Sequence, residues 1–153
     1  MSKIENRIKE LGYTLPVAPD PVASYVPGVT SGNYVWTSGQ LPLKEGTMVK
    51  TGRVGSKVSL EEAYDLAQLC ALNALAVVKA QIGDLDKVKH VVKVVGFVSS
   101  EADFYDQPKV VNGASEIIGD IFGEAGIHAR SAVGVTALPL DAPVEVEIVV
   151  EYE

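Results

Sequence analysis

The sequence predicts one α+β domain, with two long helices packed on one face of a mixed or antiparallel β-sheet. Helix-like and strand-like stretches alternate along the chain in the order hairpin, helix, strand, helix and two final strands. A chain of 153 residues is long enough to bury a single core without disulfides or metals. We therefore expect residues 1–153 to form a single domain, with residues 1–22 as an N-terminal helix and a proline-rich lead-in.

The lead-in is expected to begin with a short amphipathic helix. Ser2 is a suitable N-cap for this helix, and Gly12 is a suitable stop. One stripe of the helix is apolar and contains Ile4, Ile8 and Leu11. The prolines at positions 16, 19 and 21 then predict an extended segment.

A β-hairpin is predicted after the prolines. Two strand-like stretches, residues 24–29 and 34–39, flank a turn sequence at residues 31–33. Gly39 is expected to mark the end of this hairpin. Residues 41–57 contain three glycines and predict a loop with at most short strands.

The first long helix is predicted to start at a capping box, in which Ser59 and Glu62 satisfy each other's backbone donors. It is expected to run to about residue 82 and to end at Gly83. One stripe of small residues would let this helix pack closely on a sheet. The stripe consists of Ala63, Ala67, Cys70, Ala74 and Val77.

The remaining elements are predicted from the second half of the chain. The valine-rich residues 88–99 predict a strand. A second long helix is predicted over residues 108–122, with Asp106 interpreted as its N-terminal cap. Two further strands are predicted within residues 128–135 and 144–151.

The composition excludes several classes of function. A formal net charge of −7, with no cluster of lysine and arginine, argues against nucleic acid as a partner. The longest apolar stretch, residues 69–80, is interrupted by Asn73 and Lys79 and is too short to cross a bilayer, so we expect no membrane partner. A single cysteine and the absence of a signal-peptide pattern indicate a cytoplasmic protein.

The sequence also argues against a metal or nucleotide cofactor. His90 and His128 are the two histidines, and neither takes part in a metal-binding spacing. No glycine-rich phosphate-binding motif is present. Cys70 lies in the small-residue stripe of the first long helix, where a thiol would have a raised pKa and poor access, so it is interpreted as a core residue.

The last two strands carry the best candidates for a functional site. In the first, Arg130, Ala132 and Gly134 share one face, opposite two valines, and in the second, Glu145 and Glu147 lie opposite an apolar row. If the valine faces cover the core, the other face presents a guanidinium and a carboxylate among small side chains, as the floor of a ligand site would. The alternative is an ordinary half-exposed sheet with its charges outward.

Each candidate side chain has a chemical role and a simpler alternative. The planar fork of Arg130 suits a carboxylate ligand, although a salt bridge with Glu124 or Glu145 would use the same geometry. Glu145 could activate a water molecule in a partly desolvated pocket, or could be a solvated strand residue. Tyr25 and Ser38 offer hydroxyl groups at strand ends.

The ordered set of motifs resembles the reactive-intermediate deaminase family, also called Rid or YjgF, some members of which carry an endoribonuclease L-PSP label. The resemblance covers about residues 25–151. The motifs that carry it are Tyr25, residues 37–42, residues 94–104, Arg130-Ser131, Leu138-Pro139 and residues 144–147. It implies a chorismate-mutase-like fold and a homotrimer with three clefts between subunits. It also implies hydrolysis of reactive enamines and imines, such as 2-aminoacrylate, to a 2-keto acid and ammonia without a metal or organic cofactor.

The resemblance assigns roles to individual positions. It implies that Arg130 grips the substrate carboxylate and that Glu145 positions or activates the water. Ser38, with the backbone of Gly39, would line the pocket beside Tyr25. Two further positions are implied with a departure from the family pattern. They are Asn112, about one helical turn farther along than the usual asparagine, and Ala132, where a cysteine is common.

These departures indicate a divergent branch, so the sequence leaves the physiological substrate open. Two functions remain under consideration. The first is a deaminase that acts on enamines and imines. The second is a non-catalytic binder or sensor of small carboxylate metabolites that uses the same cleft between subunits. The carboxylate of Glu145 discriminates between them, because a binder of anions gains little from an anionic neighbour.

Overall fold

The computed structural model describes residues 2–20 and 24–153, and it confirms the α+β fold. A five-stranded mixed sheet has the order β1-β2-β7-β5-β6, in which only β5 and β6 pair in parallel among the described strands. Its strands are β1 (Gly28–Ser31), β2 (Tyr34–Thr37), β5 (Val88–Ser99), β6 (Ala129–Val135) and β7 (Val144–Tyr152). A separate two-stranded ribbon joins β3 (Leu43–Lys44) and β4 (Thr47–Met48).

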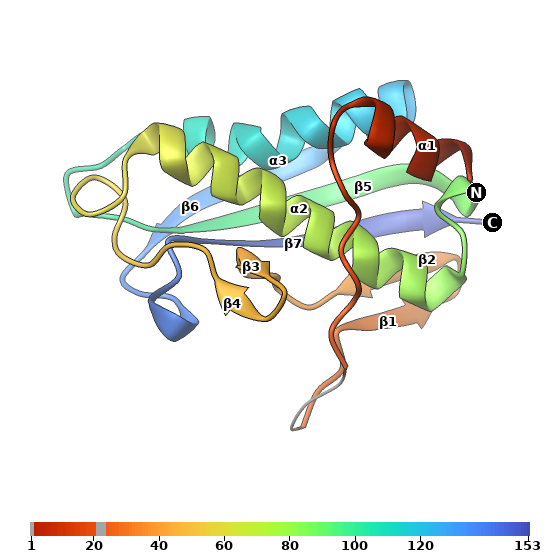
Figure 1. Ribbon diagram of the computed structural model, residues 1–153, viewed down its shortest axis with the longest axis horizontal. Helices are drawn as coiled ribbons and strands as arrows, with labels where there is room; N and C mark the ends of the chain where they lie inside the picture. The colour runs from red at the N-terminus through yellow and green to blue at the C-terminus, as the bar shows by residue number, and fades with distance from the viewer. Residues whose placement is uncertain (1, 21–23) are drawn as a thin grey trace.

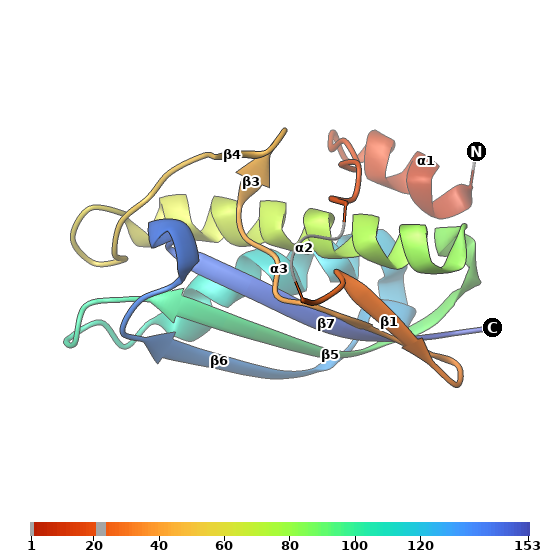
Figure 2. The same cartoon turned by 90° about the horizontal axis from the view of Figure 1, so that it is seen from below.

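Both long helices lie on the same side of this sheet. They are α2 (Leu60–Ile82) and α3 (Gln107–Phe122), and the short helix α1 (Lys3–Glu10) lies beyond them (Figure 1). Figure 2 shows the sheet from its edge, with the helices on one side and no helix on the other. Three short 3-10 turns complete the chain, at Leu85–Lys87, Gly123–Gly126 and Pro139–Asp141. We refer to the two sides of the sheet as the helix face and the open face.

Local signals in the sequence set most of the helix boundaries. Ser59 and Glu62 form the expected capping box at the start of α2, and Gly83 ends this helix with a positive φ of 87°. Ser2 caps α1 by accepting a hydrogen bond from the backbone N–H of Glu5. Of the proline-rich lead-in, residues 21–23 lie outside the described part of the chain.

The N-terminus of α3 differs from the prediction. Asp106 occupies the N-cap position, but its side chain makes no capping hydrogen bond. Its carboxylate instead lies 3.7 Å from the ammonium group of Lys109, one turn into the helix. The capping interpretation of the Asp106 side chain is therefore wrong, although the position of the helix start is right to within one residue.

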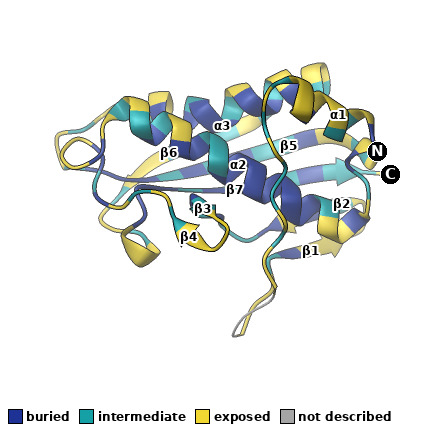
Figure 3. Ribbon diagram, in the orientation of Figure 1, coloured by how far each residue is buried: buried dark blue, intermediate teal, exposed yellow. Residues whose placement is uncertain are grey.

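The core fills the space between the helix face of the sheet and the two long helices. The apolar row of β7 is buried completely or almost completely, and it comprises Val144, Val146, Ile148 and Val150. The small-residue stripe of α2 is buried, and much of that helix carries the colour of buried residues in Figure 3. Cys70 is fully buried in this stripe, and burial raises the pKa of its thiol far above the ordinary value, as the sequence predicts.

One helix among the described residues has the length and composition of a membrane span. It is α2, whose 23 residues include an 18-residue window with a mean hydropathy of 1.2. Two thirds of its most apolar window is buried inside the fold, at 67%. These apolar side chains therefore face the protein core, which is the role that the small-residue stripe predicts for this helix.

Candidate functional site

Arg130 lies on the helix face of β6, the edge strand of the sheet. Its guanidinium reaches α3, where Nη1 donates to Asn112 Oδ1 at 2.8 Å. Ala132 packs against the core on the same face, and a side chain at Gly134 would meet Gln107 of α3. The face of β6 that carries Arg130 is thus the one covered by α3, whereas Val133 on the opposite face is 43% exposed.

Glu145 lies on the other side of the sheet. It alternates with the buried apolar row of β7 and pairs with Phe97 of β5, so its side chain is on the open face. The interpretation that Arg130 and Glu145 share one face is therefore wrong for a single chain. The valines of β7 cover the core as expected, but those of β6 face away from it.

A chain of hydrogen bonds surrounds Arg130, and we call it the Arg130 group. Besides Asn112, Nη1 donates to the hydroxyl of Ser115, one turn farther along α3, at 3.2 Å. The same hydroxyl lies 2.9 Å from Nε2 of His128, and Nδ1 of His128 lies 2.6 Å from the carbonyl oxygen of Gly126. All four side chains are half-buried. Asn112, a site candidate that only the family resemblance implied, is therefore in direct contact with Arg130.

The Arg130 guanidinium is suited to an external anion because no carboxylate of the described residues pairs with it. The other two arginines differ in this respect: Arg7 lies 3.9 Å from Glu10, and Arg53 lies 3.3 Å from Glu101. The two bonds of Arg130 use Nη1 only. Nε and Nη2 remain as a fork of parallel N–H donors, the geometry that binds a carboxylate at two points.

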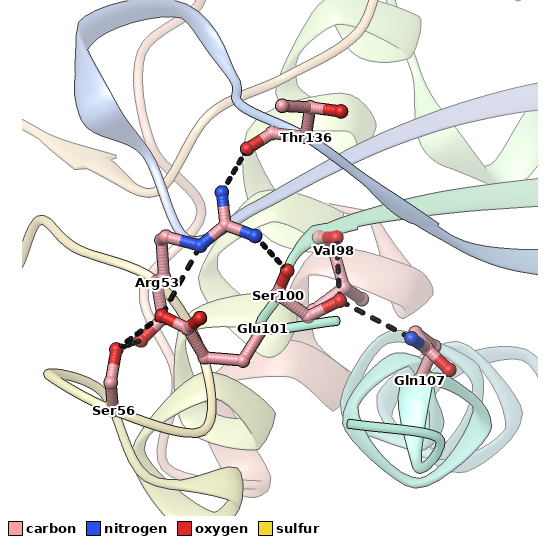
Figure 4. A network of polar contacts seen from close by, with 7 residues as sticks. All are labelled: Arg53, Ser56, Val98, Ser100, Glu101, Gln107 and Thr136. Carbon is pink, nitrogen blue, oxygen red and sulfur yellow. Dashed lines mark hydrogen bonds and ion pairs between the residues drawn. The ribbon is translucent and has the colours of Figure 1, made fainter. Parts of the chain in front are cut away.

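Arg53 shows what a fully engaged guanidinium looks like in this protein (Figure 4). It pairs with Glu101 and also donates to the carbonyl oxygens of Ser100 and Thr136, at the C-terminal ends of β5 and β6. Ser56 adds a hydrogen bond of 2.8 Å to Glu101. This network ties the loop before α2 to the sheet, and we interpret it as structural because its acceptors already occupy the guanidinium.

Glu145 belongs to a second cluster, which we call the Glu145 group and which contains Tyr25, Ser38, Gly39 and Glu145. The chain passes from Ser38 through Gly39 alongside β7, where Gln40 exchanges two backbone hydrogen bonds with Val146, at 2.8 and 3.0 Å. This pairing places Gly39 directly against the carboxylate. A Cβ atom on residue 39 would lie only 1.8 Å from Oε1 of Glu145, so glycine is required for the carboxylate to occupy this place.

The surroundings of Glu145 make it a stronger base than an ordinary glutamate. Burial raises the pKa of its half-buried carboxyl group, and the negative charge of Glu147 on the same face raises it further. A carboxylate with a raised pKa binds a proton more readily. Glu145 is therefore suited to accept a proton from a water molecule.

Replacing Gly39 with alanine is expected to displace the Glu145 carboxylate, because the added methyl group would overlap it. The carboxylate would turn toward solvent, and its pKa would fall toward the ordinary glutamate value. An NMR titration of the side-chain carboxyl carbon of Glu145 measures this change. Gly119→Ala is the matched control, since a Cβ atom there meets nothing within 4 Å. An unchanged titration in Gly39→Ala would show that Gly39 does not shape the site.

Tyr25 and Ser38 lie near the same end of the hairpin. The hydroxyl of Ser38 donates to the carbonyl oxygen of Val26 at 2.7 Å, which leaves its lone pairs able to accept a hydrogen bond. Tyr25 precedes Val26 and is 62% exposed. The structure therefore gathers Tyr25, Ser38 and Gly39 at the hairpin end, with Gly39 against Glu145 and Ser38 tied to the residue after Tyr25.

The two groups do not meet within one chain. Arg130 pairs with Val94 and Glu145 with Phe97 on the intervening strand β5, so their backbone positions are about 10 Å apart along the sheet and about 10 Å across it, with side chains on opposite faces. A hollow of about 360 Å³ beside Arg53 and Gly134 contains neither residue, nor does an apolar one of about 950 Å³ between α2 and the lead-in. Within one chain the Arg130 group and the Glu145 group are therefore separate, and we refer to them as the two half-sites.

Ser115 and His128 are the members of the Arg130 group that the sequence analysis missed. Ser115 follows Asn112 by three residues on α3, so both lie on one helix face. His128 precedes Arg130 by two residues and therefore points the same way. These spacings could have suggested the group, but only once it was known that this face of β6 is covered by α3.

Comparison with known proteins identifies the class. Residues 5–152 match the family described as YjgF/chorismate mutase-like, whose description also carries an endoribonuclease label. The chain belongs to this family, as the sequence resemblance indicates.

Individual relatives are similar to the chain over nearly its whole length. Protein TCP17 of Trypanosoma cruzi is 43% identical over 97% of this chain and 94% of its own length. A 2-iminobutanoate/2-iminopropanoate deaminase of Dermatophagoides farinae is 35% identical over 90% of this chain and 93% of its own. The crystal structure of Atu1372 from Agrobacterium tumefaciens superposes with a TM-score of 0.93, at 50% identity over 98% of this chain and 92% of that chain.

Proposed function

We propose that this protein is a hydrolase that deaminates reactive enamines and imines, such as 2-aminoacrylate, to a 2-keto acid and ammonia. The main observation that supports this proposal is the contrast between the two half-sites. One presents an arginine fork that pairs with no described carboxylate, and the other presents a carboxylate with a raised pKa. An anionic substrate that must be attacked by water needs both groups. The deaminase name of relatives at about a third identity supports the same reaction class.

The proposed reaction requires the protein to orient the substrate and to supply one proton acceptor. The enamine tautomerises to the imine, whose carbon is electrophilic. Water then adds to that carbon while Glu145 accepts one of its protons and returns it to the imine nitrogen, which gives the carbinolamine. The hydroxyl proton of the carbinolamine then passes to the same nitrogen as the carbonyl group forms, the C–N bond breaks and ammonia leaves. Arg130 holds the carboxylate throughout, so that the imine carbon stays beside the water.

A coupled assay tests the proposal directly. A pyridoxal-phosphate enzyme that generates 2-aminoacrylate or 2-iminobutanoate is mixed with the protein, and decay of the intermediate is followed. Decay faster than in buffer supports the deaminase. Decay at the buffer rate, together with binding of 2-keto acids through Arg130, would instead favour the binder or sensor of small carboxylates.

A cleft between copies would bring the half-sites together. In a ring, one surface of each copy contacts a different surface of the next, so the Arg130 group of one chain can face the Glu145 group of its neighbour. The open face supports such a contact because it exposes large apolar side chains. They include Val29 at 51%, Trp36 at 53% and Val133 at 43% exposure.

The protein is accordingly expected to sediment as a trimer, at about three times the 16.2 kDa chain mass. Trp36→Glu would place a charge in the apolar open face and is expected to shift the protein toward monomer, as measured by analytical ultracentrifugation. Val17→Glu is the control, because Val17 is 95% exposed in the lead-in rather than on the open face. A wild type that remains monomeric at all concentrations would refute the shared cleft.

The pH dependence of turnover is expected to report on Glu145. Because Glu145 must be ionised to accept a proton, turnover falls as the pH drops through its raised pKa. Glu147→Gln removes the smaller of the two causes of that increase, so the acid limb should move to lower pH. Glu151→Gln, a change on the same face of β7 at its far end, is the control. A shift to higher pH in Glu147→Gln would contradict the assignment of the base.

The endoribonuclease label attached to the family finds less support in this chain. A net charge of −7 opposes the approach of a phosphate backbone, and Arg53 already pairs with Glu101. We therefore do not propose a nuclease reaction for this protein.

A further inference from the structure

The hydrogen bonds behind Arg130 form a chain with one direction. A carbonyl oxygen can only accept, so the contact with Gly126 places the proton of His128 on Nδ1. With the proton on Nδ1 alone, Nε2 is an acceptor, and the Ser115 hydroxyl donates to it at 2.9 Å. The remaining lone pairs of Ser115 Oγ face Arg130 Nη1 at 3.2 Å.

These hydrogen bonds occupy the Nη1 end of the guanidinium. The Nη1 group carries two N–H donors, enough for its two hydrogen bonds to Asn112 and Ser115. With both donors held, rotation of the planar group would break two hydrogen bonds. The plane is fixed, and the free edge formed by Nε and Nη2 points in one direction.

We propose that Ser115 and His128 are positioning residues that orient the Arg130 fork for a substrate carboxylate. This inference rests on the carboxylate site of the proposed function but does not depend on turnover. Ser115 acts on Arg130 directly, and His128 acts through Ser115 by accepting a hydrogen bond from its hydroxyl group. Neither needs to touch the substrate, because both lie on the side of the guanidinium away from its free edge.

The affinity for a stable carboxylate, 2-oxobutanoate, tests the inference by isothermal titration calorimetry on the full chain. Ser115→Ala removes one neutral hydrogen bond to the guanidinium and is expected to weaken binding about three- to tenfold. Alanine suits a helix interior, so the variant should fold. Ser115→Thr keeps the hydroxyl and should restore most of the affinity. His128→Ala should weaken binding in the same direction, and His128→Gln less.

A double-mutant cycle shows whether Ser115 acts through Arg130. In an Arg130→Ala background, Ser115→Ala should change affinity less than about twofold, because the group that it orients is gone. A full three- to tenfold loss in that background would overturn the inference. So would unchanged affinity in Ser115→Ala. A wild type that binds no carboxylate would remove both the site and its positioning, whereas carboxylate binding without deamination would leave this inference standing and refute the proposed reaction alone.

Two further measurements separate orientation from general damage. If the deaminase is active, Ser115→Ala should raise KM while leaving kcat nearly unchanged, as expected when binding is lost equally from ground and transition states. The nitrogen NMR spectrum of neutral His128 should show a proton on Nδ1 and none on Nε2. A proton on Nε2 would reverse the direction of the hydrogen-bond chain and would overturn the role of His128.

Discussion

Replacing Arg130 with alanine is expected to lower both the affinity for 2-keto acids and the rate of imine hydrolysis by about tenfold to a hundredfold or more. A charge-assisted hydrogen bond contributes roughly 1.5–3 kcal/mol, which corresponds to that range. The loss should appear in binding and in turnover alike, since the fork holds the substrate in both states. Titration calorimetry and the coupled decay assay measure the two quantities.

Two other substitutions give this expectation its controls. Arg130→Lys keeps a positive charge but lacks the planar fork, so its affinity should fall between those of the wild type and the alanine variant. Arg7→Ala removes an exposed arginine of α1, which contacts Glu10 at 3.9 Å and the carbonyl oxygen of Asp120 at 3.0 Å, and should leave both quantities unchanged. Full activity in Arg130→Ala would remove the carboxylate site from the proposal.

Local sequence signals were sufficient where one segment determines its own structure. The capping box at Ser59 fixes the start of α2 because its two hydrogen bonds join residues only three apart. The strand at Val88–Ser99 follows from a long valine-rich stretch bounded by turn residues. In β7, the large apolar residues at 144, 146, 148 and 150 alternate with three glutamates and Val149, so only one face is apolar throughout and can cover the core.

The orientation of β6 could not be read in the same way. Its residues are mostly small, so alternation gives little preference between its two faces, and a valine face looks like the core face. The deciding interaction comes from elsewhere in the chain, because α3 supplies Asn112 and Ser115 as polar partners for Arg130.

The candidate site was predictable as a set of residues but not as an arrangement. The resemblance identified Arg130, Glu145 and the hairpin residues as candidates, but it does not show where one chain places them. The structure separates them into half-sites on opposite faces of the sheet. This separation turns the assembly into a condition of the proposed chemistry, because an isolated chain cannot bring the fork and the base to one substrate.

Glu145→Gln is expected to separate binding from catalysis. The amide keeps the shape of the side chain but cannot accept a proton, so turnover should fall by about a hundredfold or more, while the affinity for 2-keto acids is kept or improved by the loss of a negative charge. Glu147→Gln, on the same strand and face, is the matched control and should retain most of the turnover. Wild-type turnover in Glu145→Gln would show that Glu145 is not a catalytic base, whereas clearance of 2-aminoacrylate at the buffer rate by both proteins would refute the deaminase itself.

The same substitution should also make the protein more stable at neutral pH. Because burial and Glu147 raise the pKa of Glu145, the folded state binds its proton more tightly than the unfolded state does, and stability falls as the pH rises through the two pKa values. Glutamine carries no charge and escapes this loss. The melting temperature of Glu145→Gln should therefore exceed that of the wild type at pH 7, and the difference should close below the ordinary pKa of glutamate. A variant that is less stable than the wild type at pH 7 would show that the Glu145 carboxylate is held by favourable contacts rather than maintained for chemistry at a cost to the fold.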